Sequence, residues 1–219
     1  MNRRILRMGA AALLLGMGAS IPAAALAQPI LGPEAEYARV AAQARMAFTA
    51  GRYRDALMMT RDAHAFVAAE LGQDHVLTLR ALNDIAVIHQ LQGDLDAALP
   101  LALTAAGGLE RAAGPDDPET LNALANLAQL HVSRGEFDRA EPLLRRVHEA
   151  RARTLGAGHE ATLNALLELA VFLKRDGRLE QIASLLDRGA AAARAGLGAE
   201  SAIATDLTAA AAEAKGESS

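Results

Sequence analysis

Two series of glycines run through this chain with a common spacing of 42 residues. One series is Gly51, Gly93, Gly135 and Gly177, and the other is Gly72, Gly114, Gly156 and Gly198. An alanine column keeps the same spacing at Ala44, Ala86, Ala128 and Ala170. Self-similarity at a fixed period of about 20–50 residues is typical of repeat architectures, in which each unit packs on its neighbours. The sequence therefore predicts about four copies of one structural unit.

The unit at residues 115–156 predicts two helices. Apolar residues in Pro118–Ser133 recur three and four positions apart, which places them on one helical face. Asp117 is a suitable N-cap, and Pro118 suits the first helical position. A second helix is expected after Gly135-Glu136, from Phe137 to about Leu155, and Gly156 ends it. So short a joint predicts an antiparallel helical hairpin.

The composition favours an all-α fold. The chain is 52% hydrophobic but only 3% aromatic, and its alanines and leucines favour helices over a sheet of β-branched and aromatic residues. Ala128 and Ala140 fall where two helices of a hairpin must cross closely. Pro100 and Pro142 are expected to bend their helices without breaking them. Because one hairpin cannot bury its own apolar face, stacked units should form one continuous core.

Residues 1–27 have the pattern of a secretory signal peptide. Arg3, Arg4 and Arg7 form a basic start, an apolar run follows, and Ala25-Leu26-Ala27 is a cleavage site. Cleavage after Ala27 predicts a periplasmic or secreted protein. The alternative is an uncleaved membrane anchor at Met8–Ala27, against which Pro22 and the glycines of this stretch weigh. The pair Arg3-Arg4 leaves the export route open between a general and a twin-arginine signal.

Without the signal, the chain holds 19 basic and 26 acidic residues, a net charge of −7. This balance argues against nucleic-acid binding, which needs a basic face. The absence of cysteine excludes disulfides and a lipid-anchored N-terminal Cys, so no stable membrane insertion is expected after cleavage. Motifs for a catalytic nucleophile or a phosphate-binding loop are missing. We therefore expect neither an enzyme nor a cofactor.

At this point the residues resemble a known family. The pattern of the tetratricopeptide repeat resembles this sequence at six residues: Leu124, Leu127, Ala128, Gly135, Phe137 and Ala140. The motif D-x-P-x-T-L-N-x-L-x-N-L-A at residues 116–128 resembles the kinesin light chain variety of that repeat, here of an exported bacterial type. The resemblance implies an all-α, right-handed α-solenoid of about four helix hairpins with a C-terminal capping helix.

The resemblance also implies the domain organisation. A linker at 28–33 precedes four repeats at 34–72, 73–114, 115–156 and 157–198, and residues 199–219 form the capping helix and a frayed tail. The first unit is the weakest match. The fourth departs from the pattern at Ile182 and Gly189, which implies a splayed hairpin.

Arrays of this family bind a protein or an extended peptide in a concave groove lined by the first helix of each unit. Side-chain amides suit that role because each can donate and accept hydrogen bonds. The alternative for any single polar residue is simple solvation, but the whole set falls in register on one face. The resemblance implies a partner-binding groove formed by Arg45, Arg80, Asn83, Asp84, Val87, Gln90, Asn122, Asn126, Gln129, Ser133, Asn164, Glu168 and Val171.

Two further hypotheses stay open. His89 and His131 occupy one position in consecutive units and could bind a metal, although metal sites need three or four donors; packed, hydrogen-bonded histidines are the favoured interpretation. Self-assembly is the other hypothesis, because the incomplete first unit or the Ala-rich end after Gly198 could stack on a second copy and form a homo-oligomer.

The remaining titratable residues have structural interpretations. His75 and His159 lie in matched loops and should cap the helices that follow, whereas His64 and His148 are expected to be exposed. The basic run Arg145, Arg146, Arg151 and Arg153 predicts a solvated outer helix face with i,i+4 ion pairing.

Overall fold

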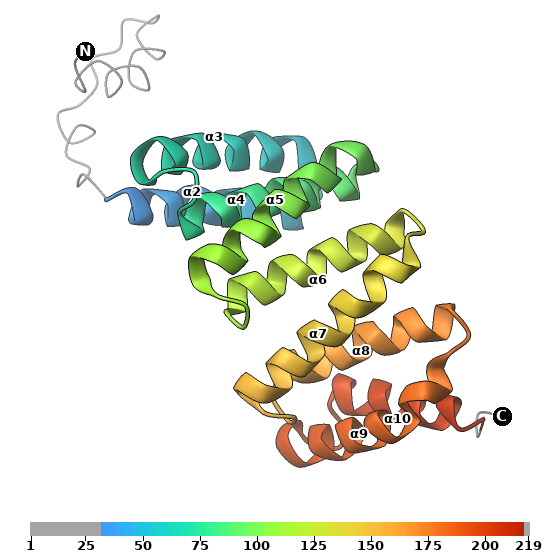
Figure 1. Cartoon of the computed structure of the whole chain (residues 1–219). Helices are drawn as coiled ribbons and strands as arrows, with labels where there is room; N and C mark the ends of the chain where they lie inside the picture. The colour runs from blue at the N-terminus through green and yellow to red at the C-terminus, as the bar shows by residue number, and fades with distance from the viewer. Residues whose placement is uncertain (1–31, 217–219) are drawn as a thin grey trace, which may run out of the picture. The chain divides into compact units, whose positions relative to one another are not determined.

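The computed structural model describes residues 32–216, and within this range it contains helices and no strands. The predicted signal peptide and most of the predicted linker lie outside the described residues, as does the end of the predicted tail. Figure 1 shows consecutive helices packed against one another along the chain. The helices are α2 Pro33–Thr49, α3 Tyr53–Leu71, α4 Val76–Leu91, α5 Leu95–Ala113, α6 Pro118–Ser133, α7 Phe137–Leu155, α8 Glu160–Arg175, η2 Leu179–Ile182, α9 Ala183–Leu197 and α10 Ala202–Ala214.

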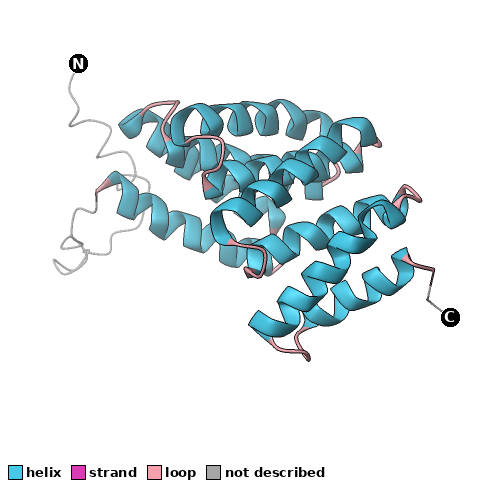
Figure 2. Cartoon of the chain, turned by 60° about the horizontal axis from the view of Figure 1, so that its bottom comes forward, coloured by secondary structure: helices cyan, strands magenta, loops and turns pink. Residues whose placement is uncertain are grey.

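The chain is an all-α solenoid of helix hairpins. The pairs α2–α3, α4–α5 and α6–α7 pack closely, each pair joined by a short turn, and each hairpin also packs on the next. Figure 2 shows the same arrangement with only loops between the helices. None of the described helices is long and apolar enough to cross a membrane.

The turns between helices follow from particular residues. Gly135 and Gly156 have φ values of 76° and 91°, a backbone region that glycine adopts without strain. At the loops between hairpins, the side chains of Asp117, His75 and His159 each accept a hydrogen bond from a backbone N–H of the helix that follows. The sequence-based prediction that the two histidines are helix caps is confirmed, and the bounds predicted for α6 and α7 agree with the structure.

A small-residue column allows each hairpin to close. Ala128 on α6 and Ala140 on α7 are fully buried, and Leu144 packs in the same cluster. Both α5 and α7 continue through Pro100 and Pro142. Each proline is the sixth residue of its helix, so it removes a single backbone hydrogen bond, to the carbonyl of Asp96 or Asp138, and the rest of the helix keeps its bonding.

The fourth hairpin differs from the third in its second helix. Ile182 stands where the third unit has Ala140, and the chain forms the short 3₁₀ helix η2 before α9 begins at Ala183. A Cβ atom added to Gly189 would lie 2.4 Å from Leu166 Cδ2, so α8 and α9 touch closely at that glycine. Elsewhere α9 packs more extensively on α10 than on α8. The predicted splaying of this hairpin agrees with that packing.

Helix α10 closes the array. Ala204, Leu207 and Ala211 on this helix are buried and join the cluster that contains Leu166 and Leu186. Ser201 caps the helix by accepting a hydrogen bond from the Ala204 N–H. The apolar side of α8 and α9 is therefore covered by a helix of the same chain.

Candidate functional site

The first helices of consecutive units carry matched positions on one side of the array. On α4 and α6, two amide contacts join residues that the sequence had assigned to one groove. Asn126 Nδ2 donates to Asn83 Oδ1 at 3.2 Å, and Gln90 Nε2 donates to Ser133 Oγ at 3.0 Å. Much of the polar character of this face is therefore used in contacts between repeats.

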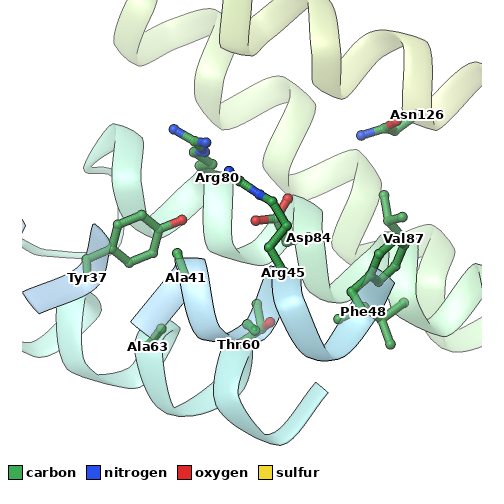
Figure 3. A pocket seen from close by; sticks show the side chains of 12 residues that line it. Tyr37, Ala41, Arg45, Phe48, Thr60, Ala63, Arg80, Asp84, Val87 and Asn126 are labelled. Carbon is green, nitrogen blue, oxygen red and sulfur yellow. The ribbon is translucent and has the colours of Figure 1, made fainter. Parts of the chain in front are cut away.

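A second set of predicted residues surrounds a cavity of about 260 Å³ between α2, α3, α4 and α6. Figure 3 shows Arg45 extending from α2 toward Arg80 and Asp84 on α4. Val87 and Asn126 also line this cavity. We call it the α2–α4 hollow. It brings together five of the thirteen predicted groove residues.

The sequence interpretation missed the rest of the α2–α4 hollow. Tyr37 stands at one end of it and Phe48 at the other, over a floor that includes Ala41 and Ala63; Ala44 also lines the cavity. The signal that could have identified the floor is a run of alanines on α2 and α3 opposite the polar positions of α4. Such alanines are ordinarily interpreted as sites of close helix packing, which is why they were not assigned to a cavity.

The charges of the hollow are unevenly paired. Arg80 Nη1 lies 3.1 Å from Glu119 Oε1. Burial raises the pKa of Asp84 to about 6, and Glu119 adds to this effect, whereas Arg80, Arg45 and a hydrogen bond from Asn83 oppose it. Burial, followed by the charge of Asp84, also raises the pKa of Tyr37 to about 12. The Tyr37 phenol therefore stays protonated and can donate a hydrogen bond at neutral pH.

A different arrangement joins the third and fourth units. Arg151 on α7 donates from Nη2 to Asn122 Oδ1 at 2.8 Å and from Nη1 to the Ala161 carbonyl at 3.3 Å. Burial raises the pKa of Glu168, and the charge of Arg151 opposes that rise. The prediction that Arg151 belongs to a solvated outer face is therefore wrong, because this side chain is half-buried between repeats. Its neighbour Arg145 does pair with Glu141 at i,i+4, at 2.9 Å.

The other predicted residues lie more openly. Gln129 and Ser133 on α6 are exposed, and the Val171 side chain on α8 is 68% exposed. Gln129 and Val171 occupy equivalent positions 42 residues apart, and we call this pair the open row; the corresponding residue of α4, Val87, lines the α2–α4 hollow. Asn164 is half-buried and makes no hydrogen bond through its side chain to any other described residue.

His89 and His131 are buried, with 8% and 4% of their surface exposed. Arg61 Nη2 donates a hydrogen bond to His89 Nε2 at 3.0 Å, whereas His89 Nδ1 is buried 3.3 Å from Asp94 Oδ2 without a hydrogen bond to any described residue. His131 Nδ1 lies 2.7 Å from Glu136 Oε2. Both rings have the geometry of packed, hydrogen-bonded histidines. Within residues 32–216, no cluster of three His, Cys, Asp or Glu side chains could hold a metal ion.

The remaining pair of histidines requires a correction. His148 is buried, with 8% of its surface exposed, and burial lowers its pKa. His64 is half-buried. The prediction that both are exposed is therefore wrong. It failed because second helices also turn a face toward the neighbouring hairpin, and His148 lies on that face beside Val147.

Similar structures share this architecture. A crystal structure of a putative kinesin light chain with nearly identical TPR-like repeats, from Podosopora anserina, has a TM-score of 0.74 at 21% identity, over 86% of this chain and 89% of that one. Its Q17M variant has the same TM-score at 20% identity, over 85% and 88% of the two chains. The crystal structure of BtubC (BKLC) from P. vanneervenii has a TM-score of 0.71 at 18% identity, over 84% and 75%.

Curated proteins give no significant match to the sequence. A family model for the tetratricopeptide repeat matches residues 36–111 and 90–153, which together span more than half of the chain. The glycine and alanine columns, the closed hairpins and this match agree with one another. The chain belongs to the tetratricopeptide repeat family.

Proposed function

We propose that this protein is a non-catalytic scaffold that binds an extended segment of a partner protein across the first helices of its repeats. The observation that carries the proposal is that the same face holds both the exposed side chains of the open row and polar side chains hydrogen-bonded between repeats. Hydrogen bonds Asn83–Asn126 and Gln90–Ser133 join α4 to α6, while Gln129 on α6 and Val171 at the equivalent position of α8 remain exposed. Such a face offers a rigid support with free side chains.

The chemistry of the open row suits a polypeptide. The amide of Gln129 can donate to and accept from a partner's backbone, and the exposed Val171 offers an apolar contact at the equivalent position of the next repeat. Asn122 and Asn126 are less suitable as contact residues, because Asn122 accepts from Arg151 and Asn126 donates to Asn83. Substitutions at these two asparagines would disturb contacts between repeats as well as binding.

The test uses the open row directly. A Gln129→Arg/Val171→Asp variant should lose capture of partner proteins from a native periplasmic extract while its unfolding transition stays within about 0.5 kcal/mol of wild type, because both side chains are exposed. Met58→Asp is the matched control, since Met58 is an exposed apolar residue on the second helix α3. Capture by the double variant of the same proteins in the same amounts as wild type would contradict the proposal.

We also propose that the protein acts after export to the periplasm. The support is the pattern at residues 1–27, with its basic start, apolar run and Ala25-Leu26-Ala27. N-terminal sequencing of the native protein should give Gln28 as its first residue. A native protein that retains Met8–Ala27 and sediments with membranes would instead favour the anchored alternative.

A further inference from the structure

The α2–α4 hollow contains two charged groups that the protein leaves without a contact partner of opposite charge. Among the described residues, neither the Arg45 guanidinium nor the Asp84 carboxylate takes part in an ion pair, whereas Arg80 is held by Glu119 at 3.1 Å. Arg45 is exposed at the rim and Asp84 is half-buried. Figure 3 shows both side chains reaching the same space between α2 and α4.

The net charge of a ligand decides whether it suits this space. A simple cation would meet Asp84 but also two guanidinium groups, Arg45 and Arg80. A simple anion would meet the guanidinium groups but also a carboxylate whose burial already makes its charge costly. A ligand that carries both charges on neighbouring atoms pairs each group with its opposite, which is the condition under which buried charges are favourable.

The rest of the hollow defines the remainder of the ligand. Ala41, Ala63 and Thr60 line its floor, and Phe48 and Val87 close one end. The Thr60 hydroxyl already donates to the Ala56 carbonyl, so an uncharged part of the ligand would meet mainly apolar surface. Its volume of about 260 Å³ is below the range of about 300–1,000 Å³ typical of pockets for drug-sized ligands. The ligand must therefore be small.

We propose that the α2–α4 hollow binds a free α-amino acid with an apolar side chain, its ammonium group on Asp84, its carboxylate on Arg45 and its side chain on the alanine floor. A polypeptide terminus does not meet this description, because no terminus carries both charges on one carbon atom. The proposal concerns small-molecule binding and does not depend on the open row, so the two can fail separately.

The test is a calorimetric titration of the full chain at about pH 7.5, where the Asp84 carboxylate is ionised. The ligand is L-leucine, and the controls are isoamylamine and 4-methylpentanoate, which are leucine without its carboxylate and without its ammonium group. Leucine should bind with a dissociation constant of about 1 mM or below, and each single-charge analogue at least about tenfold more weakly. No heat of binding at about 10 mM leucine, or equal binding of one analogue, would overturn the proposal.

Two variants assign the binding to the hollow. Asp84→Asn and Arg45→Gln should each weaken leucine binding at least about tenfold, because each removes one charge-assisted contact. Arg54→Gln, at an exposed residue of α3 outside the hollow, should bind as wild type does. Leucine binding that survives both hollow substitutions would place the ligand elsewhere and overturn the assignment. If leucine fails to bind while the protein still captures a partner through the open row, the amino-acid proposal is overturned and the proposed function stands.

Discussion

Asp84 on α4 and Glu168 on α8 occupy the same column of the repeat, two units apart, yet the molecule surrounds them differently. Burial raises the pKa of both carboxyl groups. Beside Glu168, Arg151 fills the interface and bonds to Asn122. Asp84 instead lines a cavity, and the charges of Arg80 and Arg45 act on it across that space. Neither carboxylate forms a contact ion pair with a described residue. The comparison suggests that one column can either close an interface between repeats or open a ligand site, according to what the neighbouring helix supplies.

The position of Arg151 in the repeat explains why the interface beside Glu168 is filled. Its column on the second helices holds Val67, Leu109 and Ala193, all of which are buried. An arginine in this apolar column places its guanidinium between α6 and α8, where Glu168 offers the compensating charge. One oxygen of that carboxylate, Oε2, is buried and accepts no hydrogen bond from a described residue. Arg151 and Glu168 therefore attract each other across the interface without forming a contact ion pair.

The largest effect is expected from removal of Arg151. Arg151→Leu restores the residue type of Leu109 but removes two charge-assisted hydrogen bonds, to Asn122 Oδ1 and the Ala161 carbonyl, and the positive charge that acts on Glu168. The free energy of unfolding should therefore fall by about 3 kcal/mol at neutral pH. Loss of Arg151 raises the pKa of Glu168 further, so the deficit should be larger at about pH 8 than at about pH 5. Urea unfolding at the two pH values measures both quantities.

The double variant Arg151→Leu/Glu168→Leu is the control. It removes both half-buried charges and should recover part of the lost stability, because replacing buried charges by apolar side chains is often neutral or stabilising. A double variant as unstable as the sum of the two single variants would show that the residues are independent. Arg151 would then not compensate the charge of Glu168, and the contrast between Glu168 and Asp84 would fail.

Substitution of Asp84, which lines the open cavity, should change the free energy of unfolding less and in the opposite direction. The pKa of Asp84 is raised from 3.8 to about 6, so its ionisation stabilises the unfolded chain more than the folded one. Stability from this group is complete below about pH 4 and is lost as the pH rises through about 6. Because Asp84 is only half-buried and solvent screens part of its charge, Asp84→Asn should stabilise the protein by about 2 kcal/mol at about pH 7.5 and have almost no effect at about pH 4.

Equal stability of the Asp84→Asn variant and the wild type at both pH values would show that the carboxylate is well solvated. The matched control is Asp62→Asn, at an exposed aspartate on α3, which should change little at either pH. A stabilised Asp84→Asn variant also serves the leucine titration, because its loss of binding could not then be attributed to unfolding.

Much of the fold could be predicted because the residues that start and end each helix act locally. Asp117, Pro118, Gly135 and Gly156 set the limits of α6 and α7, since a cap, a first-position proline and glycines with positive φ act within a few residues of their position. The short helix η2 could not be predicted in this way. Ile182 in place of Ala140 signals a change of packing, but how the chain accommodates it depends on neighbours distant in sequence.

The candidate site was predictable only in part, for two different reasons. Arg151 was misassigned because its neighbours Arg145, Arg146 and Arg153 point to an outer face by helical spacing; the repeat column with Val67 and Leu109 would have placed it inward. The hollow is an absence of side-chain volume above Ala41 and Ala63. In a hairpin repeat, alanine ordinarily marks close helix contact, so the residue types alone do not distinguish a closed contact from an open one.

Asn126 on α6 is the uncharged residue in the column of Asp84 and Glu168, and its substitution should have the smallest effect on stability. Its amide donates to Asn83 Oδ1 at 3.2 Å, and a neutral hydrogen bond of this kind contributes about 1 kcal/mol. Asn126→Ala should therefore lower the free energy of unfolding by about 1 kcal/mol, equally at about pH 4 and about pH 8, because no titrating group is removed. Asn164→Ala is the matched control, since the Asn164 side chain makes no hydrogen bond to any described residue, and it should cost less than about 0.5 kcal/mol. A pH-dependent loss at Asn126 would mean that its amide reports on the charge of Asp84 across the hollow, and the column would then act as one coupled unit in place of three separate contacts.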